Sequence, residues 1–127
     1  MTCPKELRYS KDHEWVKVDG TAATVGITEF AGSELGEIVF VELPEVGKEI
    51  AKGEAVCVVE STKAASDVYA PVSGKIVEVN EALSDSPETV NSDAFVSGWM
   101  VKLEVSDVSE VESLMNADEY SAMIGQS

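Results

Sequence analysis

One lysine stands out as a residue that can be modified covalently. Lys63 lies in the run Ser61-Thr62-Lys63-Ala64 and is the only basic residue between Lys52 and Lys75. The small alanines after it leave room around an ammonium group on a flexible stem, so the amine is accessible to an acylating enzyme. On spacing alone, an ordinary solvated lysine is the simpler interpretation.

Residue types that support independent catalysis are scarce. His13 is the only histidine, which disfavours a multi-histidine metal site. The sequence has no G-x-S-x-G motif to expose a nucleophilic serine, and no Walker-type or Rossmann-type glycine pattern to hold a phosphate. Acidic pairs are abundant, but without burial they identify no acid–base dyad. We therefore predict no catalytic residue and no metal site.

The charge of the chain argues against two classes of partner. Nine basic residues against twenty-four acidic ones give a net charge of -15. Such a field repels polyphosphates and anionic lipids, so nucleic-acid and membrane-surface roles are disfavoured. The acidity serves either solubility or contacts with basic patches on partners, and the sequence leaves both open.

The cysteines and the apolar runs bear on the cellular compartment of the protein. Cys3 and Cys57 share no metal-ligand spacing, and Cys57 lies in an apolar run, which predicts a buried free thiol. No segment approaches the roughly 18 apolar residues of a membrane span, and the first residues resemble neither a secretory nor a transit signal. We expect a cytoplasmic protein, or a mitochondrial matrix protein if this is a mature organelle form.

The segments that position Lys63 are predicted strands. Residues 55–60 and 66–70 favour β structure and can pair antiparallel, which places 61–64 at a hairpin tip. A second hairpin is predicted over 14–27, with Asp19-Gly20 suited to its tight turn. The remaining predicted strands are 37–43, mostly buried, 75–80 and 98–105.

Helices and loops are expected between and after these strands. A short helix is predicted over 29–35, capped by Thr28 and ended by Gly36, whereas 82–93 is predicted to be a loop. Apolar residues at helical spacing predict one or two short helices over 108–124 with a break at Asn116. We expect these helices to cover the β core rather than to form a docking site.

A short internal match suggests some symmetry. Residues 36–41 and 74–79 share the pattern G-x-I-V-x-V, with the Lys63 hairpin between them. Such a repeat suggests two similar half-sheets, although chance is the alternative for six common strand-forming residues.

The segment around Lys63 points to a family. The run VESTKAASDVYAPVSG, residues 59–74, closely resembles the lipoyl-attachment segment of the H protein of the glycine cleavage system. The resemblance extends over nearly the whole chain, through residues 9–15, 25–28, 35–37 and 119–120. One departure is Thr62, where valine is frequent in the family; both are β-branched, so the turn geometry should survive.

The resemblance implies the architecture. It predicts a mainly β protein, a lipoyl-domain-like barrel sandwich of two antiparallel sheets with a short internal helix and a C-terminal helix or helices. Residues 1–127 would form a single lipoyl-carrier domain, with a core of about 7–106 and a C-terminal helical segment of about 107–124.

The resemblance also implies a function that is not catalytic. Lipoic acid would be attached covalently to Lys63, and its dithiolane would carry an aminomethyl group on sulfur. This monomeric carrier would collect the group from glycine decarboxylase (P protein) and deliver it to aminomethyltransferase (T protein). Dihydrolipoyl dehydrogenase (L protein) would reoxidise the arm.

The family assigns roles to five further positions. Offsets from the lysine place recognition by lipoylating enzymes on Gly47, Glu60 and Gly74. The matching positions for a cleft that holds the loaded arm are Glu14 and Asp67, where a carboxylate near a protonated amine is sensible chemistry. The alternative is that both acids simply lie on the surface of a strand and have no role in binding the arm.

Three other functions compete with this one. A biotinyl domain resembles M-K-M around its lysine, and residues 62–64 lack both methionines. An enzyme using His13, Glu14 and Asp67 in a cleft would turn over without partners. A lipoyl relay to 2-oxoacid dehydrogenase complexes keeps the cofactor but changes its use.

Overall fold

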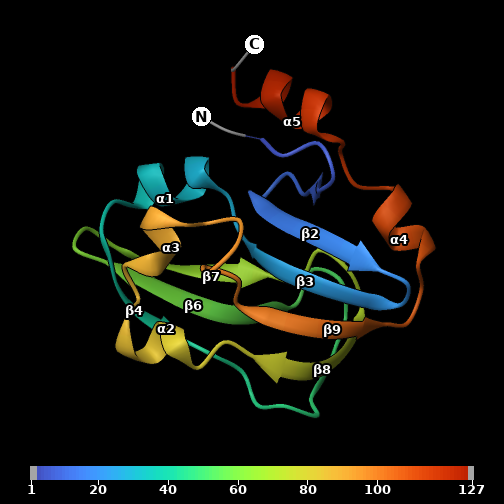
Figure 1. Ribbon diagram of the computed structural model, residues 1–127, viewed down its shortest axis with the longest axis horizontal. Helices are drawn as coiled ribbons and strands as arrows, with labels where there is room; N and C mark the ends of the chain where they lie inside the picture. The colour runs from blue at the N-terminus through green and yellow to red at the C-terminus, as the bar shows by residue number, and fades with distance from the viewer. Residues whose placement is uncertain (1–2, 126–127) are drawn as a thin grey trace.

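The chain folds as two stacked antiparallel sheets, seen in a computed structural model that describes residues 3–125 (Figure 1). The six-stranded sheet has the order β1-β2-β3-β9-β8-β5 and the three-stranded sheet the order β4-β6-β7. The mainly β sandwich is thus confirmed, but within residues 3–125 the sheets do not close into a barrel. The larger sheet consists of β1 (Arg8–Tyr9), β2 (Glu14–Asp19), β3 (Ala22–Ile27), β9 (Val101–Val105), β8 (Gly74–Val79) and β5 (Glu49–Ile50). The smaller consists of β4 (Ile38–Glu42), β6 (Ala55–Ser61) and β7 (Ala65–Tyr69).

The main core lies between the two sheets. Each sheet contributes branched aliphatic side chains that are almost fully buried, among them Val16, Val25, Ile38, Val59, Ile76 and Leu103. Burying one such side chain stabilises the fold by about 1.5–3 kcal/mol. The result is a rigid frame from which the β6–β7 hairpin extends at the left of Figure 1.

Both predicted hairpins are confirmed. β2 and β3 pair with Asp19 opposite Ala22, and Gly20 takes the positive φ of 66° that the tight turn requires. β6 and β7 pair with Glu60 opposite Ala65, which leaves Lys63 in the connecting turn. The predicted helix also forms as α1 (Glu29–Leu35), where Thr28 accepts a hydrogen bond from the backbone of Ala31.

The strand after α1 is less buried than predicted. In β4 only Ile38 and Val41 are buried, whereas Val39 is 50% and Phe40 47% exposed. The pairing register with β6 shifts between Ile38 and Phe40, and β4 lies at the edge of its sheet. Because a bulge turns neighbouring side chains to the same face, the apolar run does not mean burial here.

Several element boundaries also differ from the predictions. The predicted loop 82–93 contains two one-turn helices, α2 (Ala82–Asp85) and α3 (Thr89–Ser92), and the predicted strand 98–105 begins only at Val101. The strands β1 and β5 have two residues each, too few to give a periodic pattern. The two copies of the six-residue match lie at the start of β4 and in β8, in sheets of three and six strands, so the match does not correspond to two sheets of equal size.

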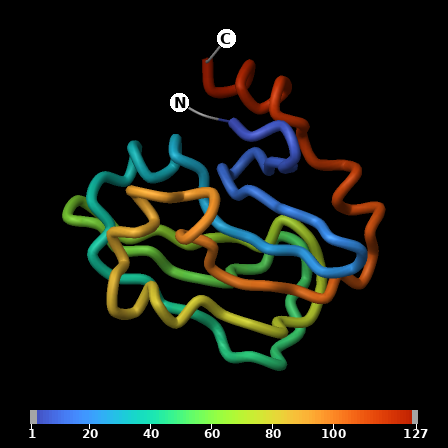
Figure 2. Tube along the Cα trace, viewed as in Figure 1, coloured from blue at the N-terminus to red at the C-terminus, as the bar shows by residue number. Residues whose placement is uncertain are grey.

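The C-terminal segment forms two short helices, as predicted, and the second of them packs against β1 and β2. The helices are α4 (Ser109–Glu112) and α5 (Ala117–Met123), and Asn116 caps α5 through a reciprocal pair of hydrogen bonds with Glu119. Figure 2 shows this end of the chain lying beside the N-terminal segment. A second apolar cluster fills the contact, formed by Leu7, Tyr9, Trp15, Ala117 and Tyr120. None of the described helices is long and apolar enough to cross a membrane.

Candidate functional site

Lys63 is exposed at a turn that its own neighbours hold in shape. The Ser61 hydroxyl accepts hydrogen bonds from the backbone N–H groups of Lys63, at 3.1 Å, and of Ala64, at 3.0 Å. The Ser61 N–H donates to the Ala64 carbonyl at 2.7 Å. No ion pair between described residues involves Lys63; Lys102 and Glu78 form the one that is found. The amine is therefore free to react while the backbone beneath it is ordered.

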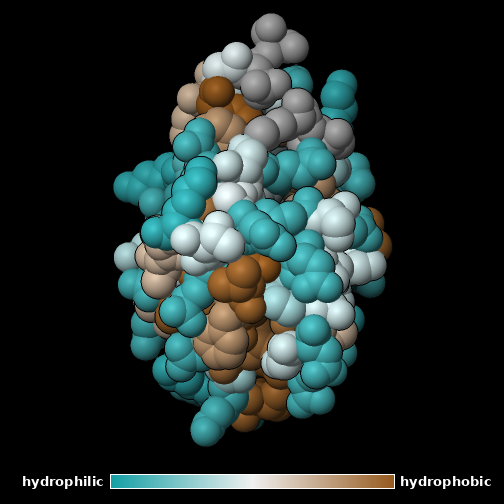
Figure 3. All heavy atoms as spheres, turned by 90° about the vertical axis from the view of Figure 1, so that its left-hand side faces the viewer, coloured by the Kyte–Doolittle hydropathy of each residue, from teal (hydrophilic) through white to brown (hydrophobic). Residues whose placement is uncertain are grey.

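The turn after α1 supports the hairpin tip from one side. The Thr62 N–H donates to the Glu37 carbonyl at 3.1 Å. Gly36 lies so close to the lysine stem that a Cβ there would be 3.2 Å from the Lys63 Cε atom. Figure 3 looks at this end of the molecule and shows an apolar patch near its centre with hydrophilic residues around it. The exposed pair Val39 and Phe40 belongs to β4, whose edge pairs with the hairpin strand β6.

Glu14 is buried rather than at the strand surface, with only 2% of its area exposed. The Ser10 hydroxyl donates to its Oε1 atom, and the Tyr69 N–H approaches its Oε2 atom at 3.4 Å. Burial raises the pKa of Glu14 to about 7, and the nearby Asp12 adds to this, whereas the bonds from Ser10 and Tyr69 oppose it. The carboxyl therefore changes its charge near neutral pH.

Glu14 lines a cavity of about 420 Å³ between β2, the end of β7 and the C-terminal segment. Its wall is mostly apolar and includes Ser10, Tyr69, Leu114, Met115 and Met123. Asp67 is exposed on β7 and lies two residues from Tyr69 on the same face of the strand, outside this wall. The face formed by Ala65, Asp67 and Tyr69 leads from the hairpin tip to the cavity, over about 13 Å at the rise of a strand.

His13 is held by a hydrogen bond and by ring contacts with Phe30 and Tyr120. Its Nδ1 atom is 2.9 Å from the Tyr120 hydroxyl, which is also 2.7 Å from the Thr28 hydroxyl. Its backbone has a φ of 70°, unusual for a residue with a side chain, and burial lowers the pKa of its ring. No group of three His, Cys, Asp or Glu among residues 3–125 is placed to hold a metal ion. These contacts tie the loop before Glu14 to α5.

The three predicted recognition residues are not brought together. Glu60 is exposed at the end of β6, next to the tip, whereas Gly74 begins β8 at the far end of the sandwich (Figure 1). Gly47 lies near Gly74, because its N–H donates to the Ile76 carbonyl at 2.7 Å.

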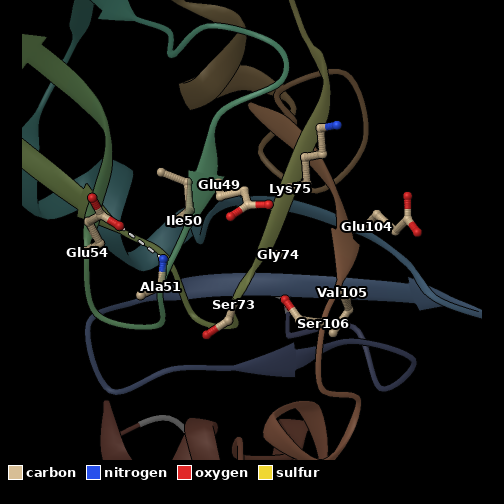
Figure 4. Close-up of a pocket in the computed structure, with 10 residues that line it drawn as sticks. All are labelled: Glu49, Ile50, Ala51, Glu54, Ser73, Gly74, Lys75, Glu104, Val105 and Ser106. Atoms are coloured by element: carbon tan, nitrogen blue, oxygen red, sulfur yellow. Dashed lines mark hydrogen bonds between the residues drawn. The ribbon is translucent and has the colours of Figure 1, made fainter.

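Gly74 has a steric reason to be glycine. Figure 4 shows it between the strands that carry Ile50 and Val105. A Cβ at Gly74 would lie 2.4 Å from the Glu104 carbonyl oxygen, a distance that no side chain can occupy. The same end holds a cavity of about 810 Å³ lined by Glu49, Glu54, Lys75 and Glu104 among others.

The predicted buried thiol is confirmed. Cys57 is free, only 3% exposed, and burial raises the pKa of its thiol to about 12. Cys3 is also free and half-buried.

Sequence reasoning missed two polar residues that support these sites. Ser10 binds Glu14 through both its donor and its acceptor, since its hydroxyl also accepts from the Glu14 N–H at 3.1 Å. Asn91 of α3 binds the turn beneath Lys63. Neither has a sequence signal of its own, because serine and asparagine are common in polar connecting segments.

Comparisons with known proteins agree with this geometry. The sequence model of the family described as "Glycine cleavage H-protein" matches residues 7–127. The chain is 58% identical to the glycine cleavage system H protein of Staphylococcus epidermidis and 59% identical to that of Staphylococcus saprophyticus. Each match spans 126 residues, 99% of this chain and 100% of the relative. A crystal structure of a glycine cleavage system H protein from Mycobacterium marinum superposes with a TM-score of 0.89 at 41% identity, over 96% of this chain and 98% of that one. The chain therefore belongs to the glycine cleavage H-protein family.

Proposed function

We propose that this chain is the lipoyl carrier of the glycine cleavage system, with lipoate attached as an amide to the Nζ atom of Lys63. The observation that carries the proposal is the placement of Lys63 on an exposed, locally hydrogen-bonded hairpin tip within a family of H proteins. The proposed role is transport between active sites, and the catalytic groups belong to partner enzymes.

The residues present fit an attached acyl arm. The Lys63 side chain is exposed, and its stem rests on Gly36, where the missing side chain leaves room. When bound, lipoate supplies a dithiolane that takes up an aminomethyl group on sulfur and is afterwards restored by oxidation. Amide formation also removes the lysine charge, so the net charge changes from -15 to -16.

Glu14 is the group best placed to hold the amine of a loaded arm. It is buried in the wall of the 420 Å³ cavity, and the exposed face of β7 leads there from the tip. A carboxylate in such surroundings forms a strong charge-assisted hydrogen bond with a protonated amine. Asp67 lies along the way, where it would contact the arm before it reaches the cavity.

Glu14 has to be ionised to bind the amine, so docking should depend on pH. With the pKa of Glu14 near 7, the carboxyl is largely protonated at pH 6 and largely ionised at pH 8. We expect the loaded arm to be held more tightly as the pH rises through 7 and to be released more readily below it.

The proposed partners are P protein, T protein and L protein, together with a lipoylating enzyme, and the chain works as a monomer. In the three-stranded sheet the charged residues of the strands are Glu42, Glu60 and Asp67, with no lysine or arginine. Basic rims around partner active sites would therefore attract this end of the molecule. We place this work in the cytoplasm, or in the mitochondrial matrix for an organelle form. Recognition by the lipoylating enzyme would involve Glu60 directly, with Gly47 and Gly74 acting through the fold.

The test is an intact-mass measurement of the full chain after incubation with lipoate, ATP and a lipoate ligase, followed by peptide mapping. One lipoyl group on Lys63 is expected, and Lys63→Arg is expected to stay unmodified although it keeps the charge. The lipoylated chain should then support glycine-dependent transfer with P and T proteins. An unmodified wild-type chain would contradict the attachment, and unchanged transfer by Lys63→Arg would contradict the role of the lysine.

A lipoyl relay to 2-oxoacid dehydrogenase complexes is the alternative use of the same arm. Deleting the gene and labelling lipoylated proteins separates the two uses. Unchanged lipoylation of those complexes is the outcome expected for a carrier of glycine cleavage alone.

A further inference from the structure

The structure assigns a positioning role to Asn91: we propose that its side chain holds the α1–β4 turn in place and thereby sets the direction in which the Lys63 arm leaves the hairpin. This inference rests on the proposed function, because it concerns the presentation of the same lysine. The inference goes beyond the proposed function because it names a residue of α3 that acts on the arm through the backbone of the α1–β4 turn.

The Asn91 side chain binds the α1–β4 turn from both sides. Its Oδ1 atom accepts from the Ile38 N–H at 2.8 Å, and its Nδ2 group donates to the Gly36 carbonyl at 3.0 Å. Nδ2 also lies 3.4 Å from the Gly32 carbonyl, in the last turns of α1. The side chain therefore provides partners for the Ile38 N–H at the strand start and for the Gly36 carbonyl at the helix end.

Residue 37, between these anchors, forms a backbone hydrogen bond with the hairpin tip. Its carbonyl accepts the Thr62 N–H at 3.1 Å, directly before Lys63 in the chain. On the other side of the contact, Gly36 meets the lysine stem, since a Cβ there would lie within 3.2 Å of Lys63 Cε, 3.6 Å of Cδ and 3.7 Å of Nζ. A shift of Gly36 or Glu37 would move both supports of the lysine.

The pairing of β4 with β6, in which Ile38 lies opposite Ser61, also holds the strand after the turn against the hairpin, but this register does not include Gly36 or Glu37. Gly36 has a φ of 89°, and its N–H bonds to the Gly32 carbonyl, which orders only the helix end. The bonds within the tip, through Ser61, fix the shape of the hairpin turn but not its position relative to α1. Within residues 3–125, Asn91 is the residue whose side chain forms hydrogen bonds on both sides of the α1–β4 turn.

Asn80 offers a matched control. Its Nδ2 group also donates to two backbone carbonyls, those of Ser97 at 2.9 Å and Trp99 at 2.8 Å, but these lie in the segment before β9. Asn80 is only 8% exposed, whereas Asn91 is exposed. Because a buried bond costs more to lose, Asn80→Ala should destabilise the fold more than Asn91→Ala.

The experiment measures lipoylation kinetics of the purified full chain with a lipoate ligase, lipoate and ATP. A misdirected lysine reaches the activated acyl group less often, which lowers kcat. A merely destabilised chain lowers the concentration of folded substrate, which raises the apparent KM and leaves kcat unchanged. For Asn91→Ala we expect kcat to fall on the order of tenfold with KM within about twofold. For Asn80→Ala we expect kcat to stay unchanged.

One further measurement and one further variant check the result independently. Hydrogen exchange at the Thr62 N–H should become faster in Asn91→Ala and stay unchanged in Asn80→Ala. If Asn91→Ala does not fold, Asn91→Asp replaces it, because this variant keeps the acceptor for Ile38 but turns a carboxylate oxygen towards the Gly36 carbonyl. The same loss of kcat is expected.

The outcomes distinguish this inference from the proposed function. An unmodified wild-type chain would overturn the proposed function itself. Normal lipoylation of the wild type, with kcat unchanged in the Asn91 variants or lowered equally in Asn80→Ala, would overturn only the positioning role.

Discussion

Lys63, where the arm is attached, and Glu14, where the loaded arm is proposed to bind, differ in the surroundings of their charged groups. Lys63 is presented to solvent on a turn held mainly by backbone and hydroxyl bonds, and no core residue depends on it. Glu14 is enclosed by Ser10, Tyr69 and the C-terminal segment, and its burial raises its pKa to about 7. The site of attachment thus costs the fold little, whereas the site proposed to receive the loaded arm is built at a cost in stability.

The sharpest test of this contrast is Lys63→Ala. We expect complete loss of lipoylation and aminomethyl transfer, with the free energy of unfolding within about 0.5 kcal/mol of the wild-type value, because Lys63 is exposed and substitutions at the surface are nearly neutral. Urea denaturation followed by circular dichroism measures the second quantity. A variant that is unfolded would show that the lysine has a structural role.

In contrast to Lys63→Ala, Glu14→Gln should change the stability of the fold. We expect a higher free energy of unfolding than that of the wild type at high pH. Since burial raises the folded pKa of Glu14 from 4.5 to about 7, the wild type loses stability as the pH rises through this window. The loss amounts to roughly 3 kcal/mol, which the neutral amide avoids. Relative to wild type, Glu14→Gln should gain stability between pH 4 and pH 8, while holding the loaded arm less well.

Asp67→Asn is the control for that comparison. Asp67 is exposed, so the same exchange of carboxylate for amide should leave the unfolding free energy unchanged at both pH values. Equal effects of the two substitutions would contradict the importance of burial at Glu14.

Tyr120→Phe should weaken the contact between α5 and the loop before Glu14. The substitution removes the hydroxyl that contacts His13 and Thr28 but keeps the ring stacked on Tyr9. We expect a loss of about 1–1.5 kcal/mol, because two partners are left without their bond. Tyr9→Phe removes one bond, to the Pro4 carbonyl, and should cost less. Equal losses would argue against a special role of the Tyr120 hydroxyl.

Ser10→Ala should lower stability by about 1 kcal/mol and should also shift the titration of Glu14 in a stated direction. The Ser10 hydroxyl bond lowers the pKa of Glu14, so its removal should raise that pKa further. A carbon-detected NMR titration of the Glu14 carboxyl measures the shift. Ser33→Ala, at an exposed hydroxyl of α1, serves as the control and should leave the titration unchanged.

The hairpin that carries Lys63 could be predicted because its strands have a local signal. Residues 55–60 and 66–70 contain β-favouring side chains, and a short segment with small residues separates them. The burial of Glu14 had no such signal. Alternation in β2 places Glu14 and Trp15 on opposite faces, yet both are buried, because the C-terminal segment and β7 cover what the pattern leaves open. Such coverage depends on contacts distant in sequence.

The support of the lysine was equally hidden. Asn91 lies in a polar segment that resembles any loop, and its partners Gly36 and Ile38 are more than fifty residues away. The exposure of Val39 and Phe40 was missed for a related reason, since an apolar run does not reveal a bulge at a sheet edge. The family resemblance supplied positions for the site, but not the contacts that shape it.

The burial of Cys57 has a consequence for a protein that handles reactive sulfur. Thiol–disulfide exchange requires a thiolate that can reach the disulfide, and Cys57 offers neither access nor ionisation with its pKa near 12. A dithiolane on the hairpin would therefore find no resolving thiol within the β core, and the oxidation state of the arm would be left to other proteins.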